Sequence, residues 1–192
     1  MKQINNLTKK ALVVMLLLVL PGYLMATTYY VDIDKADDTG DGLSWATAKK
    51  YLQSAYAMAS SGDEIWVADG VYYPDEGTGV TNNDQAAKFD LKDGVKLYGG
   101  FVGTESRPMQ RDWATNLTIL SGDIEQDDTN TDGNFIAETY TDIQGGNSNR
   151  ILNVDASATS ITSSCEVNGF YITAGYVWRR RMWDILLFRI SI

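Results

Sequence analysis

The residues best suited to bind a ligand lie in one acidic segment, residues 123–134. Side-chain oxygens recur there at every second position, and Gly133 permits a sharp bend. The four candidate ligands are Asp128, Asn130, Asp132 and Asn134. Alternating oxygen ligands before a glycine are typical of the first half of a calcium-binding loop. The spacing therefore predicts a calcium site at these four residues.

The second half of an EF-hand loop does not follow. Thr139 stands where a bidentate carboxylate is required, and no flanking helices are expected. Asp127 or Glu138 could complete the site in another geometry, and the alternative is an ordinary solvated acidic loop. A second group of acidic residues is a further calcium candidate; its members are Asp32, Asp34, Asp37, Asp38 and Asp41.

No catalytic arrangement can be placed on this sequence. The chain contains no histidine, and Cys165 is its one cysteine, so we expect that thiol to pack in the core rather than to act as a nucleophile. Trp45, Tyr51 and Tyr56 could stack on a sugar, but aromatic side chains chiefly supply burial, and we favour packing for them. We lean towards a protein without catalytic activity.

The elements that would position these residues are short strands. Runs of β-forming residues closed by Gly or Asn recur at residues 62–72, 95–100, 118–122, 150–154 and 167–173. An irregular repeat of such runs indicates a β-solenoid, whose stacked coils bury a common bore. We expect the bore to contain Ile65, Val67, Val95, Leu97, Ile119, Ile151, Val167 and Ile172.

The N-terminal part of the chain predicts a cap for this solenoid. Residues 28–33 alternate as a first strand. Ser44 is a good helix N-cap, and an apolar stripe at helical spacing follows through Ala48, Leu52 and Ala59. Gly62 ends the predicted helix. Such a helix would cover the open end of the bore and the edge of the first coil.

Several of these segments also carry a resemblance to a known family. They are residues 28–32, 40–48, 52–55, 62–68, 97–101, 111–113, 118–124 and 169–173. Together they resemble the N-terminal cap and first coils of secreted bacterial right-handed parallel β-helix proteins, the pectin-lyase-like group. The resemblance implies an all-β fold, a right-handed parallel β-helix that is truncated and has an N-terminal capping helix. The group includes polysaccharide lyases and adhesins, so the resemblance specifies fold better than function.

Length, charge and the N-terminus restrict the class of protein. The chain has 192 residues and a net charge of −9. Residues 1–26 read as a secretory signal peptide, with lysines before an apolar run and Ala26 at its end. Removing them takes away three lysines and no acid, which leaves 13 basic against 25 acidic residues, a net charge of −12. That charge argues against nucleic acid as a partner.

The sequence thus divides into a signal peptide (residues 1–26), a cap with a helix (27–61), the first coils of a parallel β-helix (62–176) and an aberrant tail (177–192). The tail is basic and then apolar. If the arginines of residues 178–183 are encoded by AGG, reading that stretch one base later gives glycines and one cysteine, the kind of turn expected before another coil. We interpret the tail as the product of a frameshift; the alternative is a genuine membrane-active or partner-binding tail.

Our expectation for function is a non-catalytic scaffold for adhesion or glycan contact, secreted or held at the cell surface or outer membrane of a bacterium. The alternative is a fragment of a polysaccharide lyase or glycoside hydrolase of the same fold. We expect polysaccharide or cell-surface components as partners, calcium as the one candidate cofactor, a monomer if the chain is complete, and no transmembrane helix in the mature chain.

Overall fold

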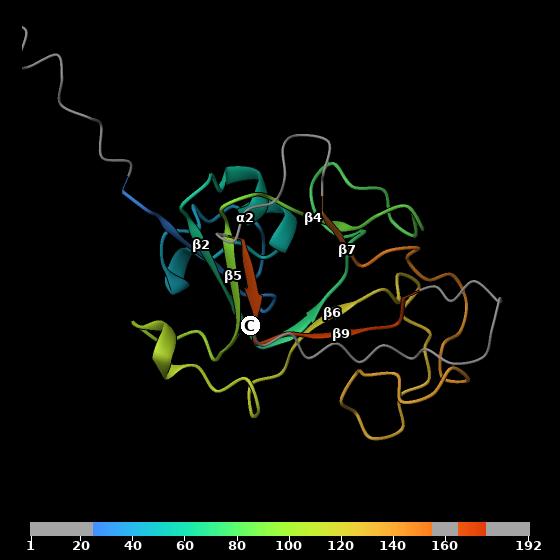
Figure 1. Ribbon diagram of the computed structural model, residues 1–192. Coiled ribbons are helices and arrows are strands. Elements are labelled where there is room, and N and C mark those ends of the chain that lie inside the picture. Colours follow the sequence, from blue (N-terminus) through green and yellow to red (C-terminus); the bar gives the residue numbers. More distant parts are fainter. Residues whose placement is uncertain (1–24, 155–164, 176–192) are drawn as a thin grey trace, which may run out of the picture.

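The computed structural model describes residues 25–154 and 165–175 (Figure 1). Most of the predicted signal peptide and the whole predicted tail, residues 177–192, lie outside the described residues. The described part is mostly β, with three sheets whose strands are all parallel and one short α-helix. Parallel stacking of this kind is the arrangement of a β-solenoid, so the predicted β-rich, stacked architecture is confirmed at that level.

The three sheets are built from strands of successive turns of the chain. Sheet A contains β1 (Thr28–Val31), β2 (Glu64–Ala68), β5 (Lys96–Phe101) and β8 (Glu166–Asn168), hydrogen-bonded in that order. Sheet B contains β3 (Gly70–Tyr72), β6 (Thr118–Ser121) and β9 (Tyr171–Thr173). Sheet C contains β4 (Phe89–Leu91) and β7 (Leu152–Val154). From β2 onward the chain visits sheets A, B and C in the same repeating order.

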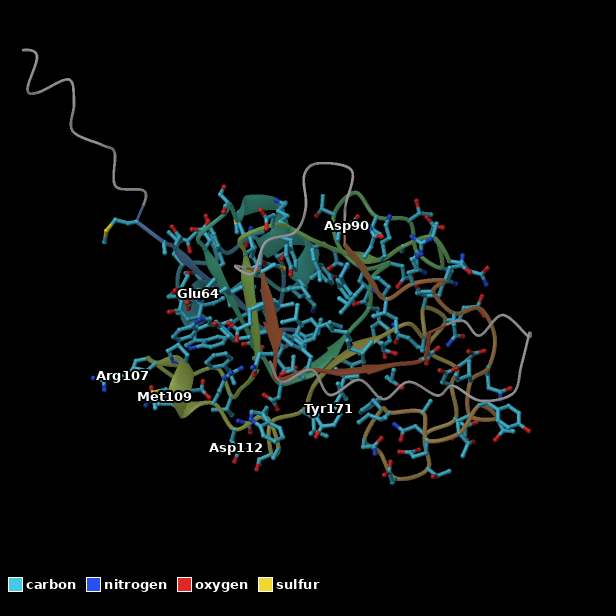
Figure 2. All side chains as sticks on the ribbon, in the orientation of Figure 1. Glu64, Asp90, Arg107, Met109, Asp112 and Tyr171 are labelled. Carbon is cyan, nitrogen blue, oxygen red and sulfur yellow. The ribbon has the colours of Figure 1, made fainter. Side chains whose placement is uncertain are left out.

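The space between the sheets is filled by apolar side chains, as the repeat predicts. Of the eight residues expected in the bore, five are buried in one hydrophobic core: Ile65, Val67, Val95, Leu97 and Ile151. Val167 and Ile172 are partly buried against the same core. Residues at equivalent positions of the stacked strands therefore form the core between the sheets. The side chains of Glu64, Asp90 and Tyr171, one from each sheet, lie on three different sides of it (Figure 2).

The prediction for Ile119 is wrong. The register of sheet B aligns Leu120 with Tyr72 and Ile172, and all three contribute to the core. Ile119 is buried, but it lies opposite Val71 and Tyr171 on the other face of the sheet. Successive side chains of a strand point to opposite faces, so an error of one residue in register exchanges the two faces.

The run at residues 62–72, expected as one strand, forms two. β2 ends at Ala68 in sheet A, and β3 begins at Gly70 in sheet B. Gly70 has a φ of 134°, which L side chains rarely adopt, and a Cβ there would collide with the side chain of Ile33. The glycine therefore makes a corner between two sheets rather than the end of a strand.

The predicted N-terminal helix is also divided. Ser44 Oγ accepts a hydrogen bond from Thr47 N at 3.3 Å, but only the 3-10 turn η1 (Trp45–Thr47) follows. Lys49 then pairs with β1: its N–H donates to Tyr30 O at 2.9 Å, and Asp32 N donates to Lys49 O at 2.8 Å. The chain leaves helical geometry because this backbone satisfies the edge of β1. The helix α2 (Leu52–Met58) begins afterwards and packs against β1 and β2.

The aromatic side chains of the cap serve packing. Trp45 and Phe101 lie against Trp66 and Tyr30 on the outer face of sheet A, and the Trp66 and Phe101 rings stack at 4.9 Å. Trp45 Nε1 donates to Glu105 O at 2.9 Å, which ties the cap to the loop after β5. Tyr56, on α2, is buried in the main core.

Cys165 has the surroundings of a packing residue. Cys165 is partly buried and packs against the main core, and burial raises the pKa of its thiol. That environment suits a packing residue and disfavours the thiolate that a nucleophile requires.

Within residues 25–154 and 165–175, no helix has the length and apolar character to span a membrane.

Candidate metal site

The acidic residues come together at the start of the long segment between β6 and β7, drawn in yellow and orange in Figure 1. Asp123 follows β6 after a single glycine. Its Oδ1 accepts a hydrogen bond from Asp127 N, and its Oδ2 accepts one from Asp128 N, both at 3.1 Å. These two bonds fold the chain into a tight turn. The turn places the side chains of Asp127 and Asp128 beside that of Asp123.

Asp123, Asp127 and Asp128 form what we call the acidic cluster. One carboxylate oxygen from each lies within 4.8 Å of the other two. Asp123 is buried, with 8% of its surface exposed, whereas Asp128 is half-buried and Asp127 is exposed. The cluster therefore has a buried side and an open side, the arrangement expected of a site that a hydrated ion can enter.

A small hollow adjoins the cluster. Its polar lining includes Asp123, Asp128, Asn130 and Tyr73, and its apolar lining includes Ile136. The space holds only a few water molecules, so it suits an ion with its water rather than an organic ligand.

The electrostatics of the cluster disfavour its negative charge. Burial raises the pKa of Asp123, and the charge of Asp127 adds to this effect. Burial also raises the pKa of Asp128 to about 6, with further contributions from the charges of Asp123 and Asp127. Hydrogen bonds from Gln144 N and Asn147 act in the opposite direction but do not offset burial. The cluster therefore holds its charge at a cost in free energy.

The phenol of Tyr73 also lines the hollow, and the negative charges nearby affect its pKa. Burial raises the pKa of Tyr73 to about 12, and the charges of Asp123, Glu76, Asp128 and Asp75 contribute in turn. No basic side chain offsets these carboxylates by direct contact: the ion pairs found among the described residues are Lys35 with Asp32 and Lys88 with Asp90. The acidic cluster lacks a paired cation within the part of the chain that the structure describes.

The four ligands predicted from spacing make different contacts in the folded loop. Asp128 belongs to the acidic cluster, and Asn130 lines the hollow, although its Oδ1 accepts from Gly133 N at 3.0 Å. Asp132 lies outside the cluster and accepts from both the N–H and the Nδ2 of Asn134. Asn134 Oδ1 in turn accepts from Ile136 N at 2.7 Å. These local bonds hold Asp132 and Asn134 within their own turn, apart from the acidic cluster.

The second predicted acidic group is also engaged by its own segment. Asp38 accepts hydrogen bonds from Lys50 N, Tyr51 N and Ser54 Oγ at 2.8, 3.2 and 2.5 Å. Asp41 Oδ1 accepts from Leu43 N and Thr47 Oγ1. These aspartates hold the cap together, and they supply no group of three converging acids among the described residues.

Asp123 and Asn147, which contact Asp128 in the folded loop, were not among the ligands predicted from spacing. Asp123 has a usable signal, because an acid directly after a predicted strand and glycine emerges at the end of a coil. Asn147 has none: it lies in a glycine-rich turn, and its contact with Asp128, Nδ2 to Oδ2 at 3.2 Å, joins residues 19 positions apart. Only the folded loop brings them together.

Comparison of the chain with protein-family models, with curated proteins and with solved structures gives no match. The resemblance to pectin-lyase-like proteins therefore stays a prediction from the residues.

Proposed function

We propose that this chain is an exported, non-catalytic bacterial protein, the beginning of a right-handed parallel β-helix that serves as a scaffold for adhesion or glycan contact. The observation that carries the proposal is the repeated register of the strands. Tyr29, Ile65, Leu97 and Val167 align across sheet A and all pack in the main core. A stack of this kind is rigid and presents its outward residues in fixed rows.

The residues that precede Ile65, Leu97 and Val167 in their strands form a row on the outer face of sheet A. This row supports a structural role. Glu64 aligns with Lys96, and Lys96 aligns with Glu166, so opposite charges alternate along this row of the sheet. Arg111 adds a second tie between coils. Its guanidinium donates to Asn168 Oδ1 at 2.8 Å and to Gly99 O at 3.3 Å, and it lies over the Tyr98 ring.

Contact with a glycan is supported by exposed aromatic rings on the segment between β6 and β7. Phe135 and Tyr140 are 57% and 70% exposed. Aromatic rings with one free face are suited to stack on sugar rings, since their apolar faces match the C–H faces of the sugar. The rings that are buried in the cap are unsuited to this role.

Binding of the purified, exported chain to immobilised bacterial and uronate polysaccharides would test the proposal. We expect retention that falls when Phe135 and Tyr140 are both replaced by Ala. Val102→Ala is the matched control, because Val102 is also exposed but lies on the loop after β5. Release of unsaturated, ultraviolet-absorbing ends from a uronate polymer would overturn the proposal in favour of a lyase.

Export has its own test. Mass spectrometry of protein from outside the cytoplasm should find Thr27 as the new N-terminus, whereas exported material that retains Met1 would contradict cleavage of residues 1–26.

A further inference from the structure

A side-chain oxygen at the acidic cluster is buried without a hydrogen-bond donor. Asn147 is 1% exposed, and its Oδ1 has no partner among the described residues. Its Nδ2 donates to Asp128 Oδ2 at 3.2 Å and to Ala174 O at 3.0 Å. Both partners are acceptors, so exchanging the amide nitrogen and oxygen would lose both bonds. The unpartnered atom is therefore the oxygen of an amide whose nitrogen contacts the Asp128 carboxylate.

A second buried oxygen without a hydrogen-bond donor among the described residues belongs to Asp75, on the segment after β3. Asp75 is 3% exposed, and its Oδ1 has no donor, while its Oδ2 accepts from Asn83 N at 2.8 Å. Its charge acts on Tyr73, which also feels Asp123 and Asp128. Buried acceptors without a partner are rare in folded proteins, and each calls for a donor or a cation.

The spacing of the three carboxylates fits one calcium ion. Calcium binds oxygen ligands at about 2.3–2.6 Å, so two oxygens on the same ion lie no more than about 5 Å apart. The three oxygens of the acidic cluster already lie within 4.8 Å of one another.

We propose that Asp123, Asp127 and Asp128 bind one calcium ion, with Asn147 Oδ1 as a further ligand and water in the remaining positions. The donor set is entirely oxygen, which favours a hard cation over zinc or copper. Mixed carboxylate and amide oxygens without octahedral order suit calcium better than magnesium. This site differs from the linear loop predicted at residues 128–134, and it does not depend on the scaffold function.

The ion would fasten the long segment between β6 and β7 to the stacked strands. Asp123 follows β6 after Gly122, and Asp128 accepts hydrogen bonds from Gln144 N at 2.6 Å and from Asn147 Nδ2. Asn147 reaches Ala174, just after β9. An ion at Asp123, Asp128 and Asn147 therefore links two neighbouring strands of sheet B and both ends of the inserted segment.

Thermal unfolding of the full chain in CaCl2 and in excess chelator would test the site. We expect the Tm to rise by about 5–10 °C once free calcium is about a hundred times the Kd. Asp127→Asn should raise the Kd for calcium at least about tenfold, since it removes one of three charged ligands. No hydrogen bond to the Asp127 side chain is found among the described residues, and the side chain is exposed, so the variant should fold.

Asp132→Asn is the matched control: it also removes one exposed carboxylate, from the same segment, and it should leave the calcium response unchanged.

Terbium luminescence provides a readout besides stability, because Tyr73 lines the hollow and would sensitise a bound terbium ion that calcium then displaces. The proposal would be overturned if calcium left the Tm unchanged and terbium gave no luminescence signal. A calcium response abolished by Asp132→Asn but kept by Asp127→Asn would overturn it in favour of the linear loop, and equal stabilisation by MgCl2 would overturn the choice of calcium.

Discussion

The loop at residues 32–41 and the acidic cluster after β6 use the same side chain, but their carboxylates have different partners. In the N-terminal loop, Asp37 and Asp41 accept hydrogen bonds from Thr39 and Thr47, and these bonds lower the pKa of both carboxyl groups. In the acidic cluster, burial raises the pKa of Asp123 and Asp128. One region is stabilised by its negative charge, and the other is destabilised by it.

The difference arises from donors and burial, not from the number of acids. Lys35 forms an ion pair with Asp32 at 3.0 Å in the N-terminal loop, and Lys49 and Lys50 lie in the adjoining turn. No basic side chain is paired with the acidic cluster in the described segments, and one of its residues, Asp123, is buried. An acidic segment therefore predicts a cation site better where burial and the lack of a paired lysine leave its negative charge uncompensated.

The largest effect is expected in the N-terminal loop. Asp38→Ala removes the acceptor for three donors at the start of α2 and should lower the free energy of unfolding by about 2–3 kcal/mol. Urea denaturation of the full chain measures this. Asp132→Ala removes an exposed acceptor within its own turn, so it should cost no more than about 0.5 kcal/mol. Equal losses in the two variants would remove the contrast between the regions.

A smaller effect of opposite sign is expected in the acidic cluster. Without calcium, Asp128→Asn removes a charge that burial disfavours and keeps an oxygen to accept from Gln144 N. We expect a gain of about 1 kcal/mol near pH 7, which already allows for screening by solvent. With calcium present the same variant should lose the stabilisation by the ion. Chelator and calcium melts of both proteins measure this reversal.

Asp41→Asn is the matched substitution in the other region. It weakens bonds that favour the charged carboxylate, so it should lower the Tm in chelator and leave the response to calcium intact. A rise in Tm for Asp41→Asn, or a fall for Asp128→Asn in chelator, would break the comparison.

The stacked fold could be predicted because its signals are local. Alternating apolar residues and closing glycines set the strands one coil at a time, and like positions then stack. The register of β6 could not be read in this way, since Ile119 and Leu120 are equally apolar and only pairing with Tyr72 decides which enters the core. The split of the N-terminal helix depends likewise on a distant partner, the edge of β1.

The calcium loop predicted from spacing shares one residue, Asp128, with the acidic cluster. Spacing alone could not show that Asp132 and Asn134 bond to their own turn, because Asn and Asp compete for nearby backbone donors. The contact of Asn147 with Asp128 depends on the path of the whole inserted segment and leaves no pattern in the sequence.

The smallest effect is the response of the calcium-free protein to pH. The pKa of Asp128 is about 6 in the folded protein against 3.8 for an ordinary aspartate, so the folded state binds this proton more tightly. Stability should therefore rise as the pH falls from about 7 through 6, and that gain is complete near pH 4. The lowered pKa values of Asp37 and Asp41 act in the other direction: their contribution is present above 3.8 and is lost as the pH falls through the lowered values. The Tm in chelator should thus rise by about 1–3 °C between pH 7 and pH 5 and fall below about pH 4. Asp128→Asn should be nearly flat between pH 7 and pH 5, and a variant that kept the full wild-type rise would assign it to other groups.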